Sequence, residues 1–437
     1  MISSLIGAAG DQFVPGDPLL ETDSWWWQVL AFVAAKVVII FIIGLVGTMF
    51  MVWFERKVVS GMQNRIGPNK AGPFGLLQTL ADGTKLFFKE DLLPKQADKW
   101  VFRLAPFLAF VPAFLVWSVI PLGGSFVQGP RGEVITDGTV RWFDSEYVSR
   151  LQLADPPVGI LFVLALSSIG VYGIMLAGWS SGSKYPLLGS VRASAQMISY
   201  EAALGLSLAS VLLFSGTLTT SGIVFEQSSR WNIVTTGFVP FIIFVIAMTA
   251  ELNRPPFDLV EAEQELVGGF NTEYSSIRFA LFFLAEFMNV ITMSAVIVTL
   301  FLGGPQPIRI SRLEVGGFIE NGDLFSWAGA FGGTIWLVLK VLAFLYVYVW
   351  FRATLPRLRY DQLMDFGWKL LIPVSLGWFL VLAAMEVARN ERGWGAGDPE
   401  MWLTISISVL VLVAAGALMM AAIGVAKRNR ENEGAAY

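Results

Sequence analysis

Long apolar stretches recur along this chain, separated by shorter polar segments. A helix needs ~20 mostly apolar residues to cross a bilayer, because the hydrocarbon core is ~30 Å thick and each residue adds ~1.5 Å. Helices satisfy their own backbone hydrogen bonds, so the pattern predicts an all-α, polytopic membrane helical bundle. The expected spans are 25–54, 101–121, 157–179, 195–214, 236–251, 277–302, 334–351, 370–388 and 402–424.

Composition agrees with lipid as the main solvent of this chain. Hydrophobic residues make up 55% and charged residues only 15%, against ~25% charged in a typical soluble domain. The weak net charge of −4 and the lack of a basic run give no indication of nucleic-acid binding. The chain has neither Cys nor His, so it lacks the usual ligands of zinc, haem and iron–sulfur clusters. If the protein serves redox chemistry, we expect the electron carriers on other subunits.

The basic residues predict an orientation in the cell (inner) membrane. Segments 55–100, 180–195, 252–278, 352–369 and the tail after 424 hold 19 Lys and Arg, whereas the opposite set of segments holds 8. Basic residues favour the cytoplasmic side, so we expect the N-terminus outside and the C-terminus in the cytoplasm. Residues 1–24 are a polar leader without the features of a signal peptide.

Two of the cytoplasmic segments differ from ordinary loops. In 55–100, a Gly- and Pro-rich turn precedes a stretch whose apolar residues, from Phe74 to Phe88, share one helical face, which predicts a helix lying in the membrane interface. Segment 251–276 is the most acidic of the chain, and Pro255-Pro256 interrupts its helical pattern. We expect this acidic loop to be packed, because its carboxylates alternate with apolar residues.

Charged residues at membrane depth are the strongest functional candidates, because each costs at least ~2.5 kcal/mol at the bilayer centre. Glu201 and Glu286 lie inside spans, Glu251 ends the fifth span, and Lys36 and Lys340 lie in the first and seventh. Carboxylates in a row can pass protons along water. Snorkelling or a structural ion pair is the alternative for each, and it has most weight for Lys36, near a span end.

The cytoplasmic segments supply further candidates. Asp258, Glu261, Glu263 and Glu265 belong to the acidic loop; a solvated helical face is the alternative interpretation. Two interpretations explain the position of Arg56. It follows the preference of basic residues for the cytoplasmic side, or it belongs to a polar rim around a lipid-accessible cavity. Phe74 suits an interface anchor or the wall of such a cavity.

Two stretches resemble one known family closely. ERKVVSGMQNRIGPNKAGPFGLLQTLADGTKLFFKED (55–91) is similar to the first cytoplasmic loop of the H subunit of bacterial NADH–quinone oxidoreductase, the respiratory complex I. AELNRPPFDLVEAEQELVGGFNTEYSS (250–276), FFLAEFMNV (282–290) and SYEAALG (199–205) are similar to its third cytoplasmic loop, its sixth helix and its fourth-helix glutamate segment. The mitochondrial counterpart in this family is the first ND subunit of complex I.

The resemblance implies a membrane core of eight helices, here 25–390, at the junction of the redox arm and the membrane arm. It implies a tunnel through which a quinone, ubiquinone or menaquinone, enters from the bilayer. FMN and iron–sulfur clusters are expected on partner subunits. The expected partners are the peripheral-arm subunits that carry the quinone site and the iron–sulfur clusters, and small membrane subunits that lead to antiporter-like subunits.

The resemblance also implies site residues. The family's acidic proton path corresponds to Glu201, Glu251, Asp258, Glu261, Glu263 and Glu286. The quinone tunnel corresponds to Arg56, Asp82 and Glu90, with Phe74 beside them, and no metal site is expected.

The C-terminal part departs from the family pattern, since a ninth helix and a basic tail within 391–437 follow the eight-helix core. Other functions stay open at this point. A related membrane subunit of a hydrogenase or of a ferredoxin- or deazaflavin-linked complex shares the ancestry. An autonomous secondary transporter is a rival without a clear inverted repeat, and a purely structural anchor would not need Glu201 and Glu286.

Overall fold

The chain folds as a helical bundle in a computed structural model. The structure describes residues 17–18, 26–124, 126–128, 134–141, 148–228, 230–259, 267–307, 309–310, 313–314, 326–392 and scattered positions between 403 and 417. Within these ranges, seven helices are long and apolar enough to cross a membrane, and α9 (Phe238–Glu251) is a shorter apolar helix. The predicted all-α membrane bundle is confirmed.

The first eight predicted spans each coincide with a helix of the structure. The long helices are α2 (Trp26–Met62), α4 (Lys99–Trp117), α5 (Gly159–Ser180), α6 (Lys184–Ser215), α11 (Ser276–Phe301), α13 (Ser326–Thr354) and α15 (Ile372–Arg392). A short α14 (Tyr360–Phe366) joins α15 through the π-helical turn Gly367–Leu371. The ninth span, 402–424, lies mostly outside the described residues, so it stays a prediction, as does the division at 24 and 390.

Local sequence signals explain where several helices begin and end. The Asp98 side chain accepts hydrogen bonds from the backbone N–H groups of Trp100 and Val101 and so caps the start of α4. Helix α6 ends at Gly216, whose left-handed backbone (φ 62°) is open to glycine without strain. These signals fix the start of α4 and the end of α6, two core helices that both pack against α5.

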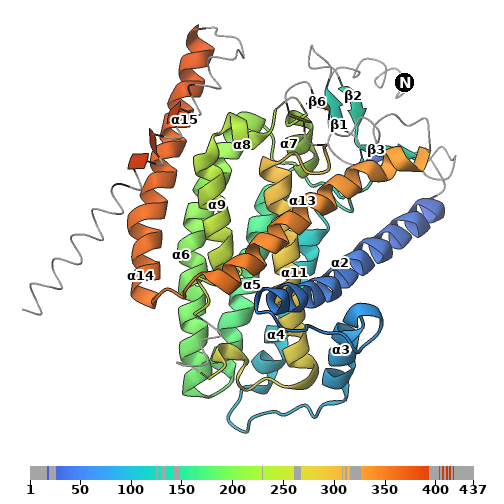
Figure 1. The fold of residues 1–437 in the computed structure, drawn as a ribbon, viewed down its shortest axis with the longest axis vertical. Helices are drawn as coiled ribbons and strands as arrows, with labels where there is room; N and C mark the ends of the chain where they lie inside the picture. Colours follow the sequence, from blue (N-terminus) through green and yellow to red (C-terminus); the bar gives the residue numbers. More distant parts are fainter. Residues whose placement is uncertain are drawn as a thin grey trace, which may run out of the picture.

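Helices α4, α5, α6, α9 and α11 pack together at the centre of the bundle (Figure 1). Helices α2 and α13 contact each other and run obliquely across α11, whereas α15 packs against the opposite flank through α6 and α9. Close contact between α4 and α5 depends on a glycine: a Cβ on Gly173 would lie 2.6 Å from the backbone nitrogen of Ala109. Small residues at helix crossings are typical of membrane bundles.

Short elements cover the two ends of the bundle. At one end, a 3₁₀ turn (η2, Pro73–Gly75) and α3 (Gln78–Phe88) follow α2, and the turn η3 (Gly269–Asn271) precedes α11. At the other end, α7 (Thr220–Glu226) and α8 (Asn232–Thr235) lie near three small hairpins (Figure 1). The hairpins pair β1 (Phe126–Gln128) with β2 (Val134–Asp137), β3 (Thr139–Arg141) with β4 (Val148–Arg150), and β5 (Arg309–Ile310) with β6 (Leu313–Glu314).

The hairpins were not predicted. Their strands are two to four residues long, too short for an alternating pattern to stand out between apolar spans. The helix expected after Phe74 is present as α3. Its place in the membrane interface stays a prediction.

Candidate functional site

Two predicted carboxylates meet at adjacent serines of α5. The Ser168 hydroxyl donates a hydrogen bond to the Glu201 carboxylate, which reaches across from α6. Glu251, the last residue of α9, is only 8% exposed, and Ser167 lies within hydrogen-bonding reach of its carboxylate. Glu201 and Glu251 are also close enough to interact electrostatically. Helix α5 therefore holds the two acids side by side.

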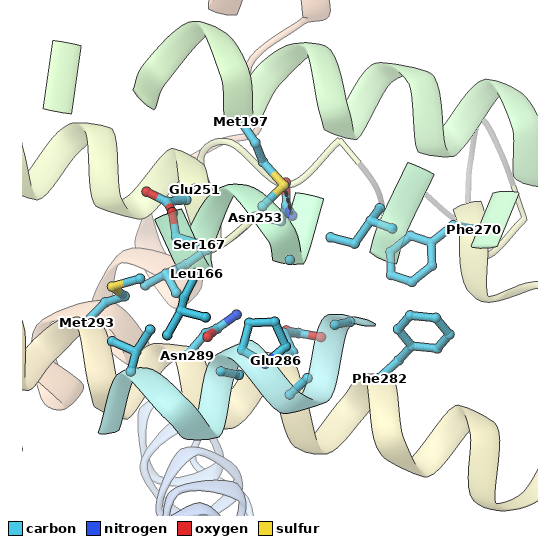
Figure 2. Close-up of a pocket in the computed structure, with 18 of the residues that line it drawn as sticks. Leu166, Ser167, Met197, Glu251, Asn253, Phe270, Phe282, Glu286, Asn289 and Met293 are labelled. Atoms are coloured by element: carbon cyan, nitrogen blue, oxygen red, sulfur yellow. Dashed lines mark hydrogen bonds between the residues drawn. The ribbon is translucent and has the colours of Figure 1, made fainter. Parts of the chain in front are cut away.

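A cavity connects Glu251 with a third predicted carboxylate, Glu286 of α11. The space open to the centres of water molecules is about 70 Å³, enough for several waters. Figure 2 shows Glu251 and Ser167 on one side of the cavity, and Glu286 and Asn289 on the other. The wall combines these polar groups with apolar side chains from α4, α5, α6 and α11. Glu286 is 29% exposed, so its carboxylate borders the cavity without being enclosed by protein.

Arg254, in the segment after α9, links Glu286 to Glu55 at the end of α2. Its guanidinium lies 3.1 Å from Glu286 Oε1 and 3.2 Å from both carboxylate oxygens of Glu55. The same guanidinium lies over the Phe287 ring, 4.7 Å from its centre. Both the Arg254 and Glu55 side chains are less than a tenth exposed. A buried pair of this kind is costly to form, and breaking it is strongly destabilising.

The end of α13 and the segment after it supply two further cations. Arg352 pairs with the Oε1 atom of Glu55, which Arg254 also contacts. Arg357 lies 3.3 Å from Asp258, a predicted site residue that is itself buried. Three arginines thus neutralise a row of carboxylates at one end of the bundle.

Both described ends of the acidic loop are fixed to neighbouring helices. At its start, the Gln196 amide of α6 donates to the carbonyl oxygens of Ala250 (2.7 Å) and Phe257 (2.8 Å). At its end, Tyr274 stacks on Phe102 of α4 and donates to the Phe102 carbonyl. Burial raises the pKa of Tyr274 to about 12, so this phenol is neutral and can donate. Glu261, Glu263 and Glu265 lie outside the described residues, between these two anchors.

The residues expected at a quinone tunnel fall into two places. Arg56 of α2 and Asp82 of α3 form an ion pair of 2.6 Å with partly exposed side chains. Phe74 lies near this pair, since its carbonyl accepts from the Trp53 indole, and its ring is 73% exposed. Glu90 lies beyond the end of α3, where its carbonyl accepts from Ser275. None of the four lines the cavity of Glu251 and Glu286.

The two lysines at membrane depth make structural contacts. Lys36 pairs with Asp17 and donates to Ser149. These contacts connect α2 to a residue N-terminal to the helix and to the hairpin β3–β4. Lys340 donates to three carbonyl oxygens, those of Leu302, Gly304 and Gln306, at the end of α11. The structural alternative is thus the better one for both.

Sequence reasoning missed several members of this network. Glu55 and Arg254 stand inside the two most distinctive stretches, but we assigned neither a role. Arg352 and Arg357 counted only toward the orientation of the chain. Spacing along one chain does not reveal that Glu55 and Arg254, 199 positions apart, form a pair.

Over the residues that the structure describes, no group of His, Cys, Asp and Glu is arranged to hold a metal ion. The site therefore consists of carboxylates, arginines and hydroxyl groups around a cavity. Its class is a polytopic membrane protein with buried acids joined by hydrogen bonds, ion pairs and water-sized space, an arrangement suited to moving or storing protons.

Comparison with known proteins gives a consistent picture. A family profile described as NADH dehydrogenase matches residues 35–383. The H subunit of NADH-quinone oxidoreductase from Frankia casuarinae is 49% identical over 418 residues, which cover 94% of this chain and 84% of the relative. The protein of that name from Frankia alni is 50% identical over 406 residues (92% and 82%), and the one from Streptomyces avermitilis 47% over 395 (90% and 80%).

The chain belongs to this family of membrane subunits, as the resemblance of its loops predicted. It is accordingly a subunit of an enzyme complex of the NADH-quinone oxidoreductase type, with other subunits of that complex as its partners.

Proposed function

We propose that this chain forms the access tunnel for a quinone and an acidic path that couples quinone reduction to proton translocation. The observation that carries the proposal is that Glu251 and Glu286 line one cavity, while Glu286 shares Arg254 with the buried Glu55. Titration of one carboxylate in such a row changes the charge that its neighbours experience. The names of the relatives supply the substrate class, a quinone.

The quinone side of the proposal concerns α2 and α3. A quinone has an apolar isoprenoid tail, which moves from lipid into a protein only along an apolar surface. Phe74, Phe87 and Phe88 are more than 60% exposed and lie on the same segment, from η2 to the end of α3, as Asp82, the partner of Arg56. We place the entrance of the tunnel there, with Arg56 at its polar rim and Glu90 further along the same segment.

The coupling side concerns the acidic path. A proton taken up at the cytoplasmic end passes between the acidic loop and Glu286, crosses the water-sized cavity to Glu251, and reaches Glu201 through the adjacent serines of α5. Asp258, Glu261 and Glu263 of the acidic loop connect this row to the quinone head group. The ion pairs of Glu55 with Arg254 and Arg352 balance the charge where the proposed quinone tunnel meets the proposed proton path.

The proposed orientation places α3 and the acidic loop in the cytoplasm, where the peripheral-arm subunits would bind. The N-terminus and the hairpins lie on the outside. FMN and iron–sulfur clusters are carried by those partners, and small membrane subunits continue the path from Glu201 toward antiporter-like subunits.

The experiment compares three forms of the assembled complex in membranes: the parent, Glu286→Gln and the control Glu226→Gln, which changes an exposed glutamate of α7. We expect Glu286→Gln to assemble but to lose most NADH-driven quinone reduction and proton pumping. Glu226→Gln should behave as the parent. Normal quinone reduction and pumping in assembled Glu286→Gln would contradict the proposed path.

A further inference from the structure

A buried hydroxyl group on α13 is not used by the network described above. Tyr348 is 3% exposed, and its hydroxyl has no hydrogen-bond partner among the described residues. Buried polar groups without partners are rare in proteins and usually have a functional or structural cause. The surroundings of Tyr348 therefore need an explanation.

The Tyr348 hydroxyl lies within hydrogen-bonding reach of Thr249 and close enough to Glu251, at the end of the same helix α9, to interact with it electrostatically. The proton of Thr249 is already committed, because its hydroxyl donates to the Val245 carbonyl at 2.7 Å. Thr249 can therefore accept from Tyr348 but cannot donate to the carboxylate of Glu251. Oxygen Oε2 of Glu251 is itself buried and has no partner among the described residues. Two buried polar atoms, the Tyr348 hydroxyl and Glu251 Oε2, thus lie close enough to interact electrostatically.

We propose that Tyr348 is a positioning residue of the acidic path, whose hydroxyl donates a hydrogen bond to Glu251 Oε2 when this carboxylate is ionised. An ionised carboxylate at this depth needs donors, because burial without hydrogen bonds is costly. Ser167 supplies one donor from α5, and Tyr348 supplies the second from α13. When Glu251 is protonated, the tyrosine hydroxyl turns to Thr249. The inference rests on the proposed acidic path and adds to it a residue that responds to the charge of Glu251.

The position of Tyr348 on α13 gives this hydrogen bond a wider effect. Arg352 follows one helical turn later, and residues four apart lie on the same side of a helix. Arg352 pairs with Glu55, which also binds Arg254, the partner of Glu286. Helix α13 therefore reaches Glu251 through Tyr348 and Glu55 through Arg352. It provides a second, protein-borne connection between the two ends of the acidic path, beside the cavity.

The test uses the complete enzyme complex carrying Tyr348→Phe, with Tyr346→Phe as the matched control. Tyr346 lies two residues away on the same helix and is 47% exposed. Infrared difference spectra between the oxidised and the quinone-reduced enzyme report the carboxyl bands, and the band of Glu251 is the one lost in Glu251→Gln. We expect this band to shift in Tyr348→Phe and to stay in place in Tyr346→Phe. Protons pumped per NADH should fall at least twofold in Tyr348→Phe only.

A second variant, Thr249→Val, keeps the tyrosine and removes the competing acceptor. The hydroxyl then has only Glu251 to bind, so the band should shift in the opposite direction to the shift in Tyr348→Phe. This variant decides the question even if Tyr348→Phe does not assemble. An unchanged Glu251 band in both variants would overturn the role of Tyr348, while the acidic path would stand if Glu251→Gln still abolishes pumping. Normal pumping in Glu251→Gln would instead overturn the path itself.

Discussion

Arg254 binds both carboxylate oxygens of Glu55, at 3.2 Å each, although the two residues are 199 positions apart in the chain. The pair joins the end of α2 to the segment after α9. Arg254 extends the contact to Glu286, and Arg352 approaches Glu55 from α13. Ion pairs therefore join charged residues on four elements. Removing the charge of any one of them changes the electrostatic environment of the others.

Removal of the Arg254 charge should be the most damaging single change in this group. Arg254→Met removes one cation partner of Glu55, which keeps Arg352, and one ion pair of Glu286, and breaking a buried pair costs about 3–5 kcal/mol. We expect little assembled complex on native gels. Glu55→Met combined with Arg254→Met should recover part of the assembly, because it removes the uncompensated charge. Full assembly of the Arg254→Met single variant would contradict a structural role for the pair.

The Arg56–Asp82 pair should behave differently, because its side chains are 44% and 37% exposed. Pairs of this kind contribute little to stability, so Arg56→Ala should assemble normally. If Arg56 borders the quinone entrance, the apparent KM for quinone should rise roughly fivefold, equivalent to about 1 kcal/mol, with kcat nearly unchanged. Steady-state kinetics with a short-chain quinone check this. Lys369→Ala serves as the control, since it removes an exposed cation from another part of the chain.

Lys340 should be required for assembly and not for pumping. Lys340→Met leaves three carbonyl groups, of Leu302, Gly304 and Gln306, without their shared donor, and charged hydrogen bonds contribute about 1.5–3 kcal/mol each. The variant complex should lose activity at a lower temperature than the parent in a heat-inactivation series. The fraction that assembles should pump the parental number of protons per NADH. A fall in that number with unchanged heat stability would make Lys340 a member of the path.

Gly173 should not tolerate even one added methyl group. Its Cβ would meet the α4 backbone at 2.6 Å from Ala109 N and 3.0 Å from Leu108 C, and overpacking costs about 1–3 kcal/mol. Gly173→Ala should therefore lower the inactivation temperature of the complex. Gly205→Ala on α6, where nothing lies within 4 Å of the added atom, should leave it unchanged or raise it slightly. Equal behaviour of the two variants would contradict the packing of α4 on α5.

The helices were predictable because lipid imposes a length and a composition on every span. Eight apolar stretches led directly to helices, and α2, which ends at Met62, is longer than the stretch 25–54 that predicted it. The hairpins depend on tertiary contacts, such as that of Lys36 with Ser149 of β4, that no periodicity records.

The acids of the site were predictable for a related reason, since Glu201, Glu251 and Glu286 stand in apolar surroundings where each charge is conspicuous. Their partners were not. Arg352 and Arg357 follow the end of a span, where orientation alone accounts for basic residues, and Tyr348 is one more aromatic in an apolar helix. Only the folded chain shows that these side chains face Glu55, Asp258 and Glu251.

The number of protons translocated per NADH oxidised decides whether Glu251 belongs to the proton path. It is measured in proteoliposomes that contain the assembled complex with Glu251→Gln, beside Glu226→Gln as the matched control. We expect this number to fall well below the parental value in Glu251→Gln and to stay at that value in Glu226→Gln. A parental number in the Glu251→Gln complex would contradict the proposed path.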